Sequence, residues 1–102
     1  MKTIDQVRRQ LFSGDYVVTR HAFRRLVERN ISEREIREAG RRANVIEEYP
    51  DDKYSPSCLL LGFTRMGRPL HIQVSLADGE SLRIITLYEP SQEEWVNYSR
   101  RR

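Results

Sequence analysis

The spacing of the apolar residues changes once along the chain, near residue 44, and this change limits the folds that are open to it. Before that point apolar residues recur every three or four positions, as Ile4, Val7 and Leu11 do on one side of a helix. After it apolar and polar residues alternate, most strictly over residues 70–76, which is typical of strands with one covered face. Helices followed by strands predict an α+β domain with the helices packed on one face of a mainly antiparallel sheet.

Capping signals predict three helices in the N-terminal part of the chain. Thr3 with Gln6 and Ser32 with Glu35 form two capping boxes, and Thr19 can cap a helix between them. The predicted helices cover about residues 4–13, 20–30 and 33–40, and a short β-favouring run lies at residues 16–18.

The C-terminal part predicts four strands, at residues 44–49, 58–63, 70–76 and 82–88, followed by a short helix that begins at Ser91. Asp78 and Gly79 form a strong two-residue hairpin signal between the last two strands, and such a loop pairs His71 with Thr86. We therefore expect a single domain over residues 1–99, with a four-stranded sheet, and a basic tail at residues 100–102.

Composition excludes several classes of protein. A chain of 102 residues suits one domain, and 38% hydrophobic residues are too many for a disordered chain. No run approaches the roughly 18 apolar residues of a membrane span, and no signal peptide is visible. The single cysteine, Cys58, cannot form an internal disulfide, and no Cys/His cluster has zinc-site spacing. We expect a cytoplasmic protein that has no metal site, no cofactor and no membrane association.

Arginine dominates the basic residues and is concentrated in the helical part. The formal net charge is +3, from 18 Lys+Arg and 15 Asp+Glu, but residues 20–42 alone hold eight arginines against four glutamates. A guanidinium suits phosphate recognition better than an ammonium does. Solvated helix faces with pairs such as Glu33 and Arg37 are the alternative explanation, and the sequence leaves both open.

The last two predicted strands carry one group of candidate site residues. Side chains two apart share a face of a sheet, so His71 and Gln73 lie on one face with Thr86 and Tyr88. The apolar Leu82 and Ile84 are expected on the same face. Polar groups next to an apolar floor are typical of a pocket. An ordinary solvent-facing side of an antiparallel sheet is the alternative.

The second predicted helix carries the other group. His21, Arg25 and Arg29 follow one another at four-residue spacing and so form one stripe. His21 lies in the first turn, where free backbone amides attract anions such as phosphate. Ordinary surface hydrogen bonds and ion pairs are the alternative for these residues.

These residue types suit the cleavage of RNA without a metal. RNA carries its own nucleophile, so a nuclease need only deprotonate the 2′-hydroxyl, stabilise charge at phosphorus and protonate the leaving 5′-oxygen. A histidine, an arginine, and a second histidine or a tyrosine suffice for these tasks. No P-loop, nucleophile elbow or pair of metal-binding carboxylates indicates another chemistry.

The chain also carries a set of motifs that resembles a known family. The motifs are Tyr16-x-x-Thr19-x-His21-Ala22-x-x-Arg25-Leu26-x-x-Arg29-x-Ile31-Ser32, Glu48-Tyr49-Pro50, Leu61-Gly62, Pro69-Leu70-His71 and Ile85-Thr86-Leu87-Tyr88-Glu89-Pro90. They resemble a small bacterial family of unknown function with a His-Ala-x-x-Arg-Met-x-x-Arg-Gly-Ile signature. Leu26 stands here in place of the signature's Met, and Asn30 in place of its Gly.

That family is similar to toxins of the RelE and MqsR type, which are metal-independent messenger RNA endoribonucleases on a compact α+β fold. The resemblance therefore implies a RelE-like domain, and it implies a cognate antitoxin with a zinc ribbon or a helix-turn-helix as the partner. The signature carries over to His21, Arg25 and Arg29, and the later motifs carry over to His71, Thr86 and Tyr88.

The resulting hypothesis is a toxin-like, metal-independent endoribonuclease of a type II toxin–antitoxin system, which cleaves free or ribosome-bound RNA by 2′-hydroxyl attack. Its catalytic residues are His21, Arg25, His71 and Tyr88, and its substrate-binding residues are Arg24, Arg29, Gln73 and Thr86. It requires that the two histidines meet at one phosphate. The alternatives are a non-catalytic module that binds nucleic acid or protein, and a domain that acts only as the partner of its antitoxin.

Overall fold

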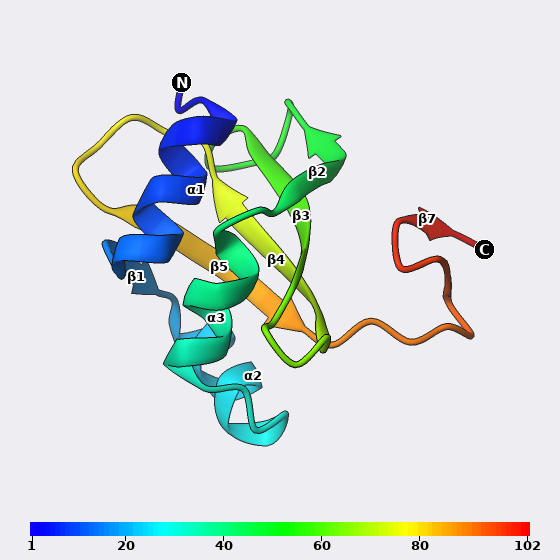
Figure 1. The fold of residues 1–102 in the computed structure, drawn as a ribbon. Coiled ribbons are helices and arrows are strands. Elements are labelled where there is room, and N and C mark those ends of the chain that lie inside the picture. The colour runs from blue at the N-terminus through cyan, green and yellow to red at the C-terminus, as the bar shows by residue number, and fades with distance from the viewer.

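The computed structural model describes residues 1–102 and has helices on one side of a twisted sheet (Figure 1). Its elements in chain order are α1 (Ile4–Ser13), β1 (Tyr16–Val18), α2 (Arg20–Glu28), α3 (Glu33–Gly40), β2 (Asn44–Tyr49), β3 (Ser57–Phe63), β4 (Pro69–Ser75), β5 (Leu82–Tyr88), β6 (Trp95–Val96) and β7 (Arg100–Arg101). The predicted α+β class is confirmed. None of the helices combines the length and the apolar character needed to cross a membrane.

Side-chain caps define the starts of the helices, as predicted. Thr3 and Ser32 each accept a hydrogen bond from the backbone amide three residues on, and the side chain of that third residue accepts one in return. Thr19 accepts from the amide of Ala22. α1 stops at Gly14, whose φ of 81° lies in the left-handed region that glycine adopts at little cost. The helix starts are therefore set by local chemistry.

The main sheet has five strands in the order β1-β5-β4-β3-β2, and not the predicted four. β1 runs parallel to β5 and pairs Tyr16 with Leu82, while the other neighbouring strands are antiparallel. The prediction left residues 16–18 out of the sheet because a three-residue run has almost no periodicity and its partner strand is distant in sequence. β1 now fixes where α2 begins, beside β5.

The predicted register between β4 and β5 is wrong. His71 pairs with Tyr88, and Gln73 pairs with Thr86. The connection between the two strands covers residues 76–81, so it is longer than the two-residue turn on which the prediction depended.

A bulge in β5 changes which of its residues face the core. Val74 pairs with Ile84 while Gln73 pairs with Thr86, so Ile85 is an extra residue in the ladder. Leu82 and Ile84, which were predicted to share a face with His71, are instead fully buried in the core. The predicted common face of His71, Gln73, Thr86 and Tyr88 remains, because these residues lie on the other side of the bulge.

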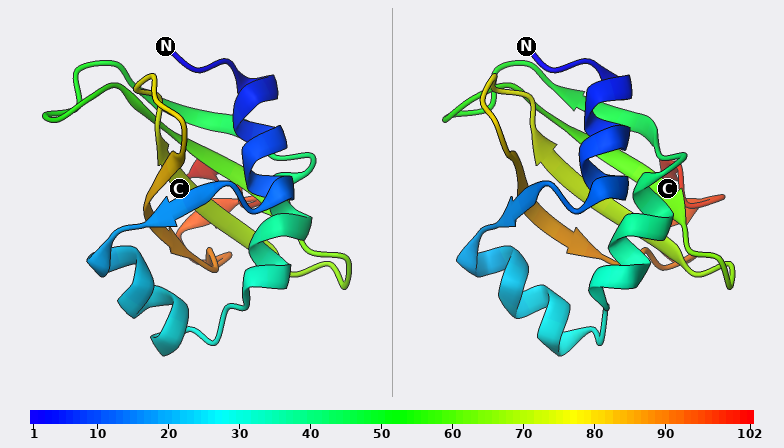
Figure 2. Two further views of the ribbon diagram at one scale, coloured as in Figure 1. Left: turned by 90° about the vertical axis from the view of Figure 1, so that its left-hand side faces the viewer. Right: turned by 60° about the vertical axis from the view of Figure 1, so that its left-hand side comes forward.

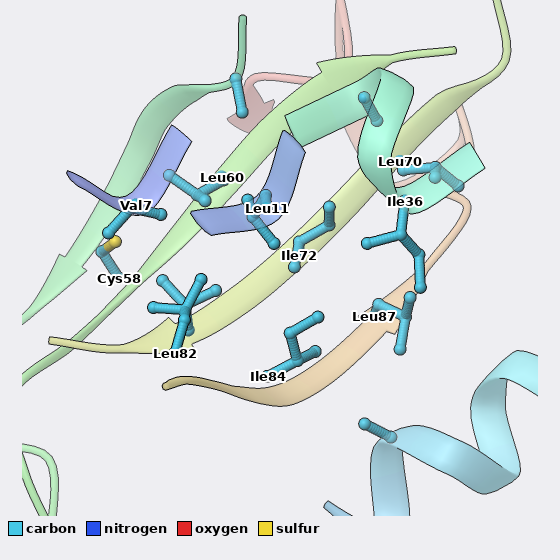
Figure 3. Packing of buried hydrophobic residues seen from close by; sticks show 14 of the residues in the cluster. Val7, Leu11, Ile36, Cys58, Leu60, Leu70, Ile72, Leu82, Ile84 and Leu87 are labelled. Carbon is cyan, nitrogen blue, oxygen red and sulfur yellow. The ribbon is translucent and has the colours of Figure 1, made fainter. Parts of the chain in front are cut away.

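The hydrophobic core lies between the sheet and helices α1 and α3 (Figure 3). Its largest fully buried members are Leu11, Ile36, Leu60, Leu70, Ile72, Leu82, Ile84 and Leu87. Burial of apolar side chains at this density supplies most of the stabilisation that a domain of this size can have. The apolar residues that alternate along the strands and those at helical spacing in α1 and α3 all lie in this one core layer.

Two glycines allow the layers to approach closely. A Cβ atom on Gly62 of β3 would lie 2.1 Å from the carbonyl oxygen of Ala39 in α3. A Cβ atom on Gly40 at the end of α3 would lie 2.3 Å from the Cβ of Leu11 in α1. Neither distance is possible, so only glycine permits this packing of α1, α3 and β3.

The predicted C-terminal helix is wrong. The chain makes a single turn after Ser91, and Asn97 and Tyr98 then take positive φ values of 53° and 61°. This tight turn reverses the chain so that β6 pairs with β7. The segment lies on the side of the sheet opposite α1 and α3 (Figure 2). Trp95 is buried there, which favours the ribbon over an exposed helix.

The Gly62→Ala substitution should lower the free energy of unfolding by about 2–3 kcal/mol, because α3 must move away from β3 to accept the methyl group. Chemical denaturation monitored by circular dichroism measures this change. Ser99→Thr adds a methyl group at an exposed position and should leave stability within about 0.5 kcal/mol of the parent. Equal stability of all three proteins would contradict the close approach.

Candidate nucleic-acid site

His71 lies on the outer face of the sheet, the face away from α1 and α3, and is completely buried. Its Nε2 lies 2.5 Å from the backbone carbonyl oxygen of Tyr98, and its Nδ1 lies 3.1 Å from the hydroxyl of Tyr88. A carbonyl oxygen can only accept, so Nε2 carries the proton and donates it. Nδ1 therefore accepts from the Tyr88 hydroxyl, and the imidazole is held neutral in one tautomer.

The C-terminal segment seals this imidazole from solvent. The ring of Trp95 meets it edge-on, with 4.4 Å between the ring centroids. Arg101 lies over Trp95 at 4.7 Å and forms an ion pair of 2.8 Å with Glu47 of β2. Burial lowers the pKa of His71, and the hydrogen bond to the Tyr98 carbonyl opposes this shift only in part.

Sequence reasoning missed the residues that close the outer face. Trp95 and Tyr98 were assigned to a helix, Arg101 to a tail, and Glu47 to no site at all. The hydrogen bonds from Arg101 lower the pKa of Glu47, despite the burial that opposes them. Only the long-range ion pair between Glu47 of β2 and Arg101 of β7 shows that Glu47 helps to close the outer face. No local signal in the sequence points to it.

Four of the predicted site residues come together between α2 and β5. Arg25, Arg29, Thr86 and Tyr88 line a hollow of about 270 Å³, which we call the phosphate hollow. Burial raises the pKa of Tyr88, so its hydroxyl keeps its proton at neutral pH.

Acidic side chains also line the phosphate hollow, namely Glu89 and Glu94. Arg68 lies 2.6 Å from Glu89 and also forms an ion pair with Glu35 of α3. Its guanidinium donates to the backbone carbonyl oxygen of Arg29 as well. Arg68 therefore offsets the charge of Glu89 and holds the end of α2 against β5.

The other predicted residues occupy different places. His21 and Gln73 line a second hollow of about 450 Å³, which we call the base hollow, between the start of α2, the loop after β2 and strands β4 and β5. Arg24 is exposed and lines neither hollow, and His71 lies beneath Trp95. The hypothesis from sequence required the two histidines to meet at one site. In the structure they do not line one hollow.

The two hollows are neighbours. His21 and Arg25 are one turn apart on α2, a rise of about 6 Å, and Ile85 of the base hollow directly precedes Thr86 of the phosphate hollow. The predicted stripe of His21, Arg25 and Arg29 thus faces β5 along its length. We refer to the two hollows together as the α2–β5 groove.

Cys58 belongs to the core and to neither hollow. Its side chain is buried, and this burial raises the pKa of the thiol to about 11. No group of three or more His, Cys, Asp or Glu side chains is close enough together to hold a metal ion.

The lowered pKa of His71 predicts that stability decreases in mild acid. The unfolded chain takes up a proton at the ordinary histidine pKa of about 6.5, while the folded chain resists it. The contribution of His71 is therefore complete above about pH 6.5 and is lost as the pH falls toward the folded-state pKa. Thermal unfolding should show a midpoint that decreases between about pH 7 and pH 5.

The His71→Gln variant should be less stable at neutral pH but should depend less on pH over this range. Its amide can still donate to the Tyr98 carbonyl, and it has no proton to take up. His21→Gln is the matched control and should keep the parental dependence. If the unfolding midpoints of the parent and His71→Gln change with pH in parallel, His71 is not the source of the dependence and the prediction is wrong.

Comparison with known proteins gave one match. Neither the curated proteins nor the solved structures contain a match to the chain. A protein-family comparison matches residues 18–89 to the family described as Domain of unknown function (DUF4258). The matched residues include those of both hollows that lie on α2, β4 and β5. The match covers more than half of the chain, and the protein therefore belongs to the DUF4258 family.

Proposed function

We propose that the chain is a metal-independent endoribonuclease of a type II toxin–antitoxin system, which acts on RNA in the cytoplasm. The observation that carries the proposal is the phosphate hollow, where Arg25 and Arg29 face Thr86 and Tyr88. Guanidinium and hydroxyl donors that converge on one small space suit a phosphodiester, which offers several acceptor oxygens.

Arg25 and Arg29 supply the positive charge in this mechanism. When the 2′-hydroxyl attacks phosphorus, negative charge grows on the non-bridging oxygens, and preplaced donors stabilise it more than they stabilise the substrate. Arg25 has only a loose contact of 3.7 Å with Glu28, so its donors are free for a ligand.

Tyr88 and His71 form the proton relay in this mechanism. The Tyr88 hydroxyl takes the proton of the 2′-hydroxyl while it passes its own proton to Nδ1 of His71, which lies 3.1 Å away. The 2′-oxygen bonds to phosphorus, the bond to the 5′-oxygen breaks, and that oxygen takes a proton from His21. His71 touches no substrate in this scheme and acts through Tyr88 as a positioning residue.

The sequence resemblance supports the same chemistry. The motif from Tyr16 to Ser32 resembles that of a family similar to toxins of the RelE and MqsR type, and the motif residues His21, Arg25 and Arg29 lie along the α2–β5 groove. The partner that this resemblance implies is an antitoxin with a zinc ribbon or a helix-turn-helix.

A non-catalytic module that binds nucleic acid or protein is the second candidate. The burial of His71 favours it, because an imidazole with both nitrogens bonded already has a complete structural role in closing the outer face. For such an RNA-binding module, affinity falls steeply with salt and no arginine substitution has more than a modest effect.

The test is cleavage of a mixed-sequence RNA in EDTA, with analysis of the product ends. We expect 2′,3′-cyclic phosphates, a rate about 10²-fold or more lower for Tyr88→Phe, and unchanged RNA affinity for that variant. Tyr16→Phe is the matched control, since the Tyr16 hydroxyl is buried without a hydrogen-bond partner. Arg25→Ala should also lose turnover, whereas Arg42→Ala, at an exposed position outside the groove, should not.

The pH profile of the rate tests the role of His71. The rate of the parent should fall on the acid side, where His71 takes up a proton, and His71→Gln should remove this limb of the profile. If His71 has only a structural role, the limb belongs to another group and the variant keeps it. If the folded parent binds RNA but does not cleave it, with or without ribosomes, the non-catalytic module is the correct reading.

A further inference from the structure

The base hollow has a mixed lining, of which the proposed mechanism uses only His21. Besides His21 and Gln73, it is lined by Thr19, Asp52, Tyr54, Ser55, Ser75, Arg83 and Ile85. Its volume of about 450 Å³ is within the range of small-ligand sites. The lining contains one carboxylate and one free guanidinium, besides an aromatic ring and several neutral polar groups.

Hydrogen bonds hold the floor of this hollow in place. Gln73 donates to the hydroxyl of Ser57 at 3.2 Å, and Ser57 donates to Oδ2 of Asp52 at 2.6 Å. The hydroxyls of Ser55 and Ser75 are 2.8 Å apart. Because Ser57 is buried and both of its bonds are made within the chain, the network is complete without a ligand and keeps the loop after β2 on the strands.

Several groups around this floor keep unused hydrogen-bonding capacity. Oδ1 of Asp52 accepts only from the amide of Lys53, and each carboxylate oxygen has two acceptor positions. Arg83 is exposed and its guanidinium makes no bond within the chain. Tyr54 is 87% exposed and the ammonium of Lys53 lies over one face of its ring, so the other face is free for stacking.

We infer that this hollow binds an unpaired guanine of the RNA substrate. Guanine presents two adjacent acceptors, O6 and N7, which an arginine fork matches, and two adjacent donors, N1–H and N2–H₂, which a carboxylate matches. Arg83 and Asp52 supply these two complements, and Tyr54 supplies the stacking surface that unpaired bases use. No other standard base offers both pairs on separate edges.

The position of the hollow fits a guanine beside the cleaved bond. Since the base hollow and the phosphate hollow are neighbours along α2 and β5, a nucleotide whose phosphate reaches Arg25 can place its base near Arg83. This inference rests on the proposed function for the identity of the ligand as RNA. It adds that the cleavage site contains guanine.

Binding of nucleoside 3′-monophosphates to the intact protein tests the inference without any cleavage. We expect the guanosine compound to bind about tenfold or more tightly than its adenosine, cytidine and uridine counterparts in calorimetric titrations. Inosine 3′-monophosphate lacks the N2 amine and should bind more weakly than the guanosine compound. Arg83→Gln and Asp52→Asn should remove the preference, whereas Arg65→Gln and Asp51→Asn, at exposed positions outside the hollow, should keep it.

Thermal unfolding establishes that each variant is folded, and Arg83→Gln removes no hydrogen bond or ion pair within the chain. Equal binding of the four nucleotides, no binding of any, or a guanine preference that survives both Arg83→Gln and Asp52→Asn would overturn the inference. The two proposals fail in different ways. Guanine-selective binding without RNA cleavage would refute the nuclease alone, and cleavage without guanine at the cut sites would refute the base hollow alone.

Discussion

The hydrogen bond from Nε2 of His71 to the backbone of Tyr98 holds the C-terminal segment on the outer face of the sheet. Without it the buried Nε2 of His71 would lack a hydrogen-bond partner, which costs more free energy than the bond itself contributes. The same imidazole accepts a hydrogen bond from Tyr88, which lines the phosphate hollow. Closure of the outer face and preparation of the site therefore depend on one side chain.

The distribution of arginines also favours the groove as the candidate site. Most arginines of α3 and α1 lie exposed on the surface with acidic neighbours, as Arg37 does beside Glu33 and Glu38. Arg25 and Arg29 also have acidic neighbours, but they additionally face a strand that offers hydroxyl groups. Net charge alone would favour neither surface, because it is nearly balanced over the chain. Geometry selects the α2–β5 groove, since only there do cationic and hydroxyl groups converge with a tyrosine bonded to a histidine.

Much of this fold can be predicted from local sequence patterns, and the predictions are wrong where long-range contacts determine the structure. Thr3, Thr19 and Ser32 cap helices by bonds to their own next turn, so the sequence reveals them. The bulge at Ile85 follows from pairing with β4, which alternation cannot show. For the site, four residues of one hollow were predicted because helical and strand spacing place them on matching faces. His71 was predicted to be a catalytic residue because nothing in the local sequence shows that Trp95 covers it.

Chemical-shift mapping with a non-cleavable 2′-O-methyl RNA tests most directly the central claim that RNA lies in the α2–β5 groove. Spectra of the isotope-labelled protein would be recorded as the RNA is added. The account predicts that the largest shifts occur at Arg25, Arg29, Thr86 and Tyr88, with smaller ones in the base hollow. Shifts centred on Arg34 and Arg37 of α3 and on Arg41 just after it, with none in the groove, would contradict it.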